Sequence, residues 1–341
     1  MGSKNFLLTI VFLFVFINTI LFPQDKGKQI FVANWNLENL FDTVDDPQKE
    51  DEEFLPSSAL EWTQERLEKK LSNLAKVIHS MNNGNGPDIL SVEEVENQGL
   101  LDTLIQKYLS DKNYKIAYAD CPDSRGIDVG IIYNADILTF AGQHADTVKL
   151  SDNHPTRLIL CSAFILPGKD TLYVYANHWP SRRGGENESD QNREAAAQTL
   201  RQDIDKLFKM NTNSNILIMG DFNDEPSNES LNKTLDAINF ECEALSKNNS
   251  DLYNLAFHKH LAKDGSYFYR GNWNMLDNII VSKHVMEKFY KCESFEVYRP
   301  EFMVTRSGKY KDSPFPTYGG KRYLGGYSDH FPVTAILQIA K

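Results

Sequence analysis

Short apolar runs separated by turn residues dominate the chain, and most of these runs are too short to form helices. Runs of this length, rich in Val, Ile, Leu and aromatic residues, predict β-strands. They lie at residues 30–33, 89–92, 130–133, 158–166, 172–176, 216–219, 278–281 and 333–339.

Two longer segments show apolar residues at the helical spacing of three and four. Residues 60–81 carry one such stripe with Glu and Lys on the opposite face, and Gly84 to Pro87 follow as a stop signal. Residues 191–210 show the same spacing. Because strands outnumber helices, the pattern favours a pair of sheets with helices outside over a doubly wound parallel sheet.

Composition limits the organisation of the chain. The protein has 341 residues, of which 41% are apolar, and no Pro/Gly-rich linker divides it. We therefore expect one domain over residues 30–341. The formal net charge of −11 gives no sign that the surface as a whole binds nucleic acid or an anionic membrane.

The first 22 residues have the pattern of a targeting segment. Lys4 precedes a run from Phe6 to Phe22 that is almost entirely apolar. This predicts a signal peptide or a short membrane anchor over residues 1–22, and hence export to the periplasm or the extracellular space. No small-x-small cleavage site is evident, so cleavage or retention stays open. Any membrane contact is expected through this segment alone, and no stable protein partner is indicated.

Four cysteines are widely spaced, at Cys121, Cys161, Cys242 and Cys292. An exported chain with an even number of cysteines can form two disulfides, and four thiols packed in the core are an equal alternative. The spacing lacks the CxxC form common in zinc sites, so the sequence predicts no structural zinc.

Polar side chains with metal-binding or acid–base chemistry recur where predicted strands begin or end. Taken singly, each fits a turn or a solvated loop. Because strand ends at one edge of a sheet lie close together, the whole set predicts a single cleft. The set comprises Asn36, Glu94, His178, Asp221, Asn223, Asp277, Asp329 and His330.

The ordered motifs N…EE…NH…GDFN…LDN…SDH resemble the endonuclease/exonuclease/phosphatase superfamily, from Asn36 to His330. The resemblance implies a four-layered α/β sandwich of two mixed, mostly antiparallel β-sheets flanked by helices. It also implies metal-dependent hydrolysis of a phosphate ester. Glu94 would be the main metal ligand, with Asn36 and Asp329 near it. Oxygen ligands of this kind suit Mg²⁺ or Mn²⁺.

The same resemblance gives the remaining polar residues roles in hydrolysis. His330, paired with Asp277, would exchange a proton, and Asp221 would orient the attacking water. Asn223 and His178 would contact the phosphoryl oxygens. Whether His330 or Asp221 is the formal base stays open.

One position departs from the family pattern, and one histidine has no evident hydrogen-bond partner in the motifs. Residue 93 is Glu where many members have Gln, which makes this part of the site more acidic. We expect stronger metal binding or a raised carboxylate pKa as alternative consequences. The expected partner of His178 is Asp128, with a turn or core carboxylate as the alternative role of Asp128.

Basic residues near the motifs indicate an anionic substrate. Arg125, Arg182 and Arg183 are candidates for phosphate binding, with an exposed basic loop as the alternative. Residues 299–323 contain six basic residues against two acidic ones, interleaved with aromatic residues. Such a loop favours a nucleic-acid strand, so the leading expectation is an exported nuclease of low sequence specificity. A sphingomyelinase-like lipid phosphodiesterase or a sugar- or inositol-phosphate phosphatase is the alternative.

Seven acidic residues lie between Asp42 and Glu53. A solvated loop is the first interpretation of this segment, and a weak Ca²⁺ site is the second.

Overall fold

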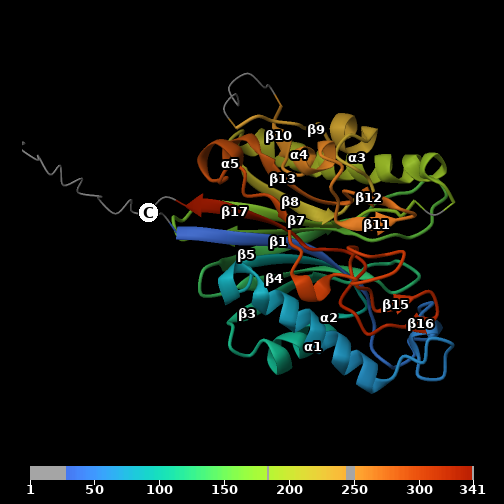
Figure 1. Cartoon of the computed structure of the whole chain (residues 1–341). Helices are drawn as coiled ribbons and strands as arrows, with labels where there is room; N and C mark the ends of the chain where they lie inside the picture. Colours follow the sequence, from blue (N-terminus) through green and yellow to red (C-terminus); the bar gives the residue numbers. More distant parts are fainter. Residues whose placement is uncertain (1–27, 183, 243–249, 340–341) are drawn as a thin grey trace, which may run out of the picture.

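The computed structural model describes residues 28–182, 184–242 and 250–339, which form two β-sheets packed face to face (Figure 1). The first sheet has six strands, in the order β14 (Glu296–Val297), β17 (Val333–Ile339), β1 (Lys28–Leu40), β2 (Ile89–Val95), β4 (Asp128–Asn134) and β3 (Tyr114–Ala119). The second has seven, in the order β5 (Thr139–Asp146), β6 (Ile159–Ile165), β7 (Thr171–His178), β8 (Asn215–Asp221), β13 (Asp277–Ser282), β10 (Leu252–Asn254) and β9 (Ala237–Ile238). Two hairpins stand apart, β11 (Tyr267–Tyr269) with β12 (Asn272–Asn274) and β15 (Tyr318–Gly319) with β16 (Arg322–Tyr323).

Helices cover the outer faces of both sheets, with α1 and α2 beside the first sheet and α3, α4 and α5 beside the second (Figure 1). Their bounds are α1 (Gln64–Ser80), α2 (Gln98–Thr103), α3 (Glu186–Met210), α4 (Phe257–Leu261) and α5 (Lys283–Lys288). Single 3-10 or π turns lie at 52–54, 82–84, 104–108, 230–234 and 301–303. Within the described ranges, no helix has the length and apolar character needed to cross a membrane.

The four-layered sandwich expected from the sequence is confirmed, and each of the eight predicted runs coincides with a strand. The first predicted helix begins four residues too early, because Glu61 adopts a left-handed backbone (φ 48°) and α1 starts only at Gln64. Strand β5 is absent from the sequence prediction. Its side chains are mostly exposed, so it carries no apolar alternation.

Mixed strand pairing directs several strand ends to one edge of the sandwich. Strands β1 and β2 run parallel, as do β7 and β8, so these pairs share the direction in which their last residues point. Strands β13 and β17 pair antiparallel with β8 and β1, so their first residues lie at that same edge. The motif residues identified in the sequence lie at or within a few residues of these ends.

Two apolar layers hold the arrangement. Between the sheets, fully buried side chains from β1, β2 and β4 meet those of β7, β8 and β13, for example Ile89, Ile131 and Leu217. A second layer lies between the outer face of the seven-stranded sheet and α3, where Ile218 meets Leu200 and Ile204. Burial of this kind is the main stabilising contribution to a sandwich fold.

The cysteines divide into one bridge and two buried thiols. Cys242 and Cys292 form a disulfide across a sequence separation of 50, whereas Cys121 and Cys161 are free. Neither alternative drawn from the sequence, two bridges or four thiols, describes the chain.

Candidate active site

Strand register in the second sheet brings three of the motif residues side by side. His178 on β7 is the partner of Asp221 on β8, and Asp221 is in turn the partner of Asp277 on β13. Gly220 makes this close approach feasible, since a Cβ atom at this position would lie 2.2 Å from the carbonyl oxygen of Asn177. The glycine of the GDFN motif therefore serves packing between β7 and β8.

A bulge in the first sheet positions the candidate metal ligand. The register of β2 against β4 shifts between Glu93 and Val95, and Glu94 between them adopts φ 61°. A non-glycine residue in this region is uncommon and strained, and it turns the Glu94 side chain away from the regular alternation of the strand. Glu94 lines the cleft, while its Oε2 accepts a hydrogen bond from Asn39 N at 3.0 Å.

The two sheets meet at the site through side-chain hydrogen bonds. Asn36 Nδ2, where the regular pairing of β1 with β2 ends, donates to Asp221 Oδ2 at 3.1 Å. His330 Nδ1, just before β17, lies 2.7 Å from Asp277 Oδ2, and Asp277 is fully buried. The predicted pairing of His330 with Asp277 is thus present in the structure.

Other residues fix Asp277 and the His330 ring in place. Ser266 Oγ donates to Asp277 Oδ2 at 2.5 Å, and Asn34 Nδ2 donates to Asp277 Oδ1 at 3.2 Å. The Tyr267 ring stacks on the His330 ring, with centroids 4.6 Å apart and planes 25° apart. These contacts leave His330 Nε2 as the ring atom that faces Asp221 and Asp329, 4.0 Å from an oxygen of each.

The remaining predicted residues largely share one cleft of 350 Å³. Its lining includes Glu94, Arg125, His178, Arg182, Asp221, Asn223, Tyr267, Tyr269, Asp329 and His330. Asn36 and Asp277 stand behind this surface and contact it through Asp221 and His330. Arg183 lies outside the described residues. The sequence therefore located the cleft and most of its wall.

The two arginines of the cleft differ in their anchoring. Arg182 Nε donates to Asn223 O at 2.7 Å and its Nη2 approaches Asp224 Oδ1 at 3.5 Å, which ties it to the loop after β8. The Arg125 side chain is 41% exposed and pairs with Asp123 at 3.4 Å. Both guanidinium groups offer positive charge at the rim, where a substrate phosphate would enter.

Several carboxylates lie close together at the floor of the cleft, and their negative charges require a compensating positive charge. Burial raises the pKa of Asp221, and the nearby Asp277 carboxylate adds to this effect against the opposing charge of His330. Burial likewise raises the pKa of Asp329, helped by Glu38 and Glu94. A divalent cation among these oxygens would stabilise their ionised forms, so the donor set fits Mg²⁺ or Mn²⁺.

Glu93 is fully buried behind this floor. Ser91 Oγ donates to its Oε1 at 2.8 Å, and burial together with Asp277 and Asp221 raises its pKa well above the usual value. A protonated Glu93 has nearly the size and charge of the Gln common in the family. This direction agrees with one of the two consequences expected from the sequence, a raised carboxylate pKa.

His178 is held in its neutral form. Burial lowers its pKa well below the usual value, and the positive charges of Arg157 and Arg125 lower it further. Its Nε2 lies 3.8 Å from both Glu94 Oε1 and Asp221 Oδ2, pointing into the cleft. A neutral imidazole there can donate one N–H to a phosphoryl oxygen.

The predicted partner of His178 is wrong. Asp128 accepts hydrogen bonds from the hydroxyl of Tyr118 and from Cys121 N instead. The main chain of His178 is fixed by Arg157, whose Nε donates to His178 O at 3.0 Å while its Nη1 bonds Asp123 Oδ2 at 2.9 Å. Arg157 escaped sequence analysis because a single arginine ahead of a strand gives no signal of burial.

The basic segment 299–323 divides into a structural and an exposed part. Arg299 packs over the Trp273 ring at 4.5 Å and pairs with Asp264, so it belongs to the scaffold. Arg306, Lys309, Lys311, Lys321 and Arg322 are exposed.

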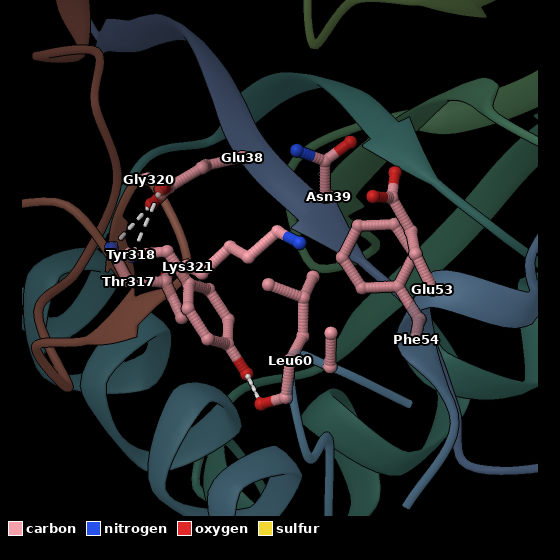
Figure 2. A pocket seen from close by; sticks show the side chains of 10 residues that line it. Glu38, Asn39, Glu53, Phe54, Leu60, Thr317, Tyr318, Gly320 and Lys321 are labelled. Carbon is pink, nitrogen blue, oxygen red and sulfur yellow. Dashed lines mark hydrogen bonds between the residues drawn. The ribbon is translucent and has the colours of Figure 1, made fainter. Parts of the chain in front are cut away.

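Lys321 extends across a pocket of 490 Å³ whose wall includes Glu38, Asn39, Phe54 and Tyr318 (Figure 2). Since Asn39 bonds Glu94, this pocket adjoins the metal-ligand side of the cleft. The exposed part of the basic segment therefore reaches the immediate neighbourhood of the candidate site.

The model of the endonuclease/exonuclease/phosphatase family matches residues 31–340. The chain belongs to this family. Its members are metal-dependent phosphoesterases, which agrees with the oxygen-rich cleft described above. No curated protein sequence matches the chain.

Solved structures share the fold at low identity. TDP2 of Caenorhabditis elegans is 17% identical, with a TM-score of 0.55 over 92% of this chain and 99% of that one. The human Nocturnin catalytic domain is 16% identical, with a TM-score of 0.53 over 91% and 93%. A mannosyl-6-phosphatase of Bacteroides thetaiotaomicron is 16% identical, with a TM-score of 0.52 over 91% and 100%. At these identities the likeness establishes the fold and leaves the substrate to be argued from the site.

Proposed function

We propose that this protein is an exported, divalent-metal-dependent phosphodiesterase that cleaves single-stranded or locally opened nucleic acid with little sequence preference. The observation that carries the substrate class is a pair of tyrosines at the cleft. The rings of Tyr267 and Tyr269 lie parallel within 14° at 6.1 Å, Tyr267 covers His330, and Tyr269 is 51% exposed. Bases stack on exposed aromatic faces regardless of their identity, which favours binding without sequence readout.

Positive charge lies in the same cleft as this aromatic surface and in the adjoining pocket. Arg125 and Arg182 line the cleft, and Lys321 reaches the adjoining pocket. A strand whose scissile phosphate lies in the cleft would meet cations on either side, as phosphate contacts along a backbone require. Among the structures with this fold, TDP2 of Danio rerio has been solved with a single-stranded DNA product, at 12% identity to this chain.

The residues of the cleft supply the chemistry of hydrolysis. Glu94, with Asn36 and Asp329 nearby, would hold Mg²⁺, which neutralises charge on the phosphoryl group. Asp221 orients the attacking water, and His330 exchanges a proton while Asp277 stabilises its cationic form. Neutral His178 and Asn223 donate hydrogen bonds to the non-bridging oxygens as their charge increases.

A sugar-phosphate phosphatase is the second candidate, favoured by the pocket in Figure 2. Carboxylates of Glu38 and Glu53 and the amide of Asn39 line it, and such groups bind sugar hydroxyls while repelling a polyanion. Here Glu38 already accepts hydrogen bonds from Thr317 N at 2.6 Å and Tyr318 N at 3.4 Å. Its carboxylate is thus mostly engaged by the protein, which leaves the nucleic-acid proposal stronger.

Export rests on the sequence of residues 1–22, which lie outside the described residues, together with one structural feature. The disulfide between Cys242 and Cys292 is of the kind that persists in oxidising compartments. We propose a periplasmic or extracellular location, with anchoring through residues 6–22 if they are retained. Fractionation of the source cell tests this: full-length protein in the cytosol with its first residues intact would contradict it.

Cleavage assays with Mg²⁺ on single-stranded DNA, duplex DNA, RNA, sugar phosphates and sphingomyelin test the substrate. We expect internal cleavage of the single strands. The variant replacing Lys309, Lys311, Lys321 and Arg322 by Ala should raise KM on polymers and flatten its salt dependence, by a log–log slope of about 0.7 per lost contact on a single strand. Hydrolysis of bis-nitrophenyl phosphate serves as the control and should hardly change. Release of free phosphate or phosphocholine, with no cleavage of nucleic acid, would overturn the proposal.

A further inference from the structure

A cluster of three different metal-binding side chains lies on the outer face of the second sheet, away from the cleft. His144 on β5 and Cys161 on β6 are register partners, so their side chains stand next to each other on one face. Asp203 on α3 packs over them. One donor atom of each residue lies within 4.8 Å of the other two.

A further carboxylate stands beside His144. Asp146 follows His144 by two residues on β5 and so shares its face. Its Oδ2 lies 3.7 Å from His144 Nε2. This oxygen is buried and accepts no hydrogen bond from any residue that the structure describes. A buried carboxylate oxygen without a donor is costly, and a cation at this point would compensate it.

Neighbouring side chains orient Asp203 toward the cluster. The Tyr175 hydroxyl donates to Asp203 Oδ2 at 2.7 Å, and His144 Nε2 lies 2.8 Å from the same oxygen. Lys206 Nζ, on a largely exposed side chain, binds the other oxygen at 3.1 Å. Hydrogen bonds of this sort to a carboxylate are typical of the residues that surround metal ligands.

We propose that His144, Cys161 and Asp203 bind a Zn²⁺ ion, with Asp146 beside His144 as a further carboxylate. A thiolate, an imidazole and a carboxylate are donors that Zn²⁺ prefers, and movement of the Asp146 side chain toward the ion would supply a fourth protein ligand and close a tetrahedral site. The site differs in chemistry from the cleft, whose oxygen-only donors favour Mg²⁺ or Mn²⁺. A tetrahedral zinc would separate its N and O donors by about 3.4 Å, so His144 and Asp203 need to part by only about 0.6 Å.

The proposal differs from the sequence-based expectation of no structural zinc. That expectation considered only cysteines close together in the chain. Here the ligands are brought together by strand register between β5 and β6 and by the packing of α3, which no local spacing reveals.

Binding of the metal would release the thiol proton of Cys161. It would also link the edge strand β5 to its neighbours. Burial raises the pKa of the Cys161 thiol to about 12, so the ion must displace the thiol proton to solvent, and affinity must fall as the pH falls. Most β5 side chains are exposed, so apolar packing holds this strand weakly. A zinc ion would join β5 to β6 and to α3.

The alternative is a metal-free network in which His144 and Asp203 form an ion pair. Cobalt(II) distinguishes the two, because a cobalt–thiolate bond gives a charge-transfer absorption in the near ultraviolet that oxygen and nitrogen ligands do not. The full chain, freed of metal by a chelator, is titrated with Co²⁺ in excess Mg²⁺ to occupy the cleft. We expect the thiolate band, and its loss when Zn²⁺ is added.

Matched variants assign the band to this cluster. Cys161→Ser should abolish it, whereas Cys121→Ser should retain it, because Cys121 is also a buried free thiol near a carboxylate but has no imidazole beside it. His144→Ala, at a side chain that is 50% exposed, should fold and weaken Co²⁺ binding by more than the roughly 10- to 100-fold that loss of a residue supporting a ligand costs, because it removes a ligand itself. Zn²⁺ should raise the Tm of the wild type and not that of His144→Ala.

Three results would overturn the proposal. The first is the absence of a thiolate band in the wild type at saturating Co²⁺. The second is unchanged affinity in His144→Ala. The third is a band that survives in Cys161→Ser or disappears in Cys121→Ser.

Discussion

Replacing Asp277 with Asn tests the acid–base assignment most directly, because it removes one charge and preserves the shape of the side chain. Asp277 is fully buried and contacts His330 Nδ1 at 2.7 Å. In the wild type, burial alone would lower the pKa of His330, but Asp277, Asp329 and Asp221 together raise it well above the usual value. The substitution removes the strongest of these opposing effects.

The expected loss follows from the bond that disappears. A hydrogen bond to a charged group contributes about 1.5–3 kcal/mol, which corresponds to roughly 10- to 150-fold in kcat/KM if the bond forms fully only when His330 is protonated during the reaction. His330 must be neutral to accept a proton, so activity rises as the pH passes upward through its pKa. Because Asp277→Asn lowers that pKa, the acid limb of the profile should move to lower pH while the plateau falls.

The assay is kcat/KM on bis-nitrophenyl phosphate from pH 5 to 10 at saturating Mg²⁺, with Tm measured at each pH. Ser266→Ala is the matched control, since it removes a hydrogen bond at 2.5 Å from the same carboxylate and leaves its charge. It should lower the rate less and leave the acid limb in place. In a His330→Gln background, Asp277→Asn should have little further effect, because the two residues act as one unit.

A plateau that falls with no movement of the acid limb would refute the assignment of His330 as the group that titrates. A limb that moves to higher pH would show that the cationic form is the active one. In that case Asp221 would become the proton acceptor, and His330 would act as a positive charge near the phosphoryl group.

Three further predictions follow from individual contacts. Activity should vanish in EDTA, return with Mg²⁺, and fall at least about 100-fold in Glu94→Ala, whereas full turnover in EDTA would disprove the metal requirement. Gly220→Ala should lower both Tm and kcat, because its Cβ would lie 2.2 Å from Asn177 O, while Gly168→Ala, with its nearest atom at 3.9 Å, should do neither. Burial raises the pKa of Asp128 to about 6, so its contribution to stability is full below about pH 4 and is lost as the pH rises through 6. Asp128→Asn should remove up to about 3 kcal/mol of this pH dependence in urea unfolding, and an unchanged slope would contradict it.

Strand runs and strand-end motifs could be predicted because both are local signals. The GDFN motif follows an apolar run that is buried on both faces, so its acid had to stand at a strand end. Strand β5 gave no such signal, because an edge strand with exposed side chains needs no apolar alternation. Helix α1 was predicted from its stripe of apolar residues, but the position where it starts depends on the left-handed backbone conformation of Glu61. The apolar spacing does not encode that conformation.

The contacts that tune the site lie beyond sequence analysis. Arg157 binds the main chain of His178 from 21 residues away, and Ser266 binds Asp277 from 11 residues away. The assignment of Asp128 to His178 is wrong because Tyr118 and Cys121 N occupy the Asp128 carboxylate instead. In the fold, Asp128 starts β4 and faces Tyr118 on the adjacent strand β3. Such pairings depend on loop paths, which the residue types alone leave undetermined.

The candidate site is divided between the two sheets, and this division governs how substitutions should act. Asn36, Glu94 and His330 belong to segments of the first sheet, and Asp221 and Asp277 to the second, joined by the Asn36–Asp221 and His330–Asp277 contacts. The spacing between the candidate metal ligands and the candidate proton-transfer groups is therefore set by the apolar layer between the sheets. A cavity made there, by Leu217→Ala for example, should alter kcat as well as stability, since an error of about 1 Å in position costs roughly 100-fold in rate.

Loops outside this layer, such as residues 299–323, can change their contacts with substrate without moving the residues of the cleft. A change in these loops can therefore alter which substrate is bound without disturbing the residues at the strand ends.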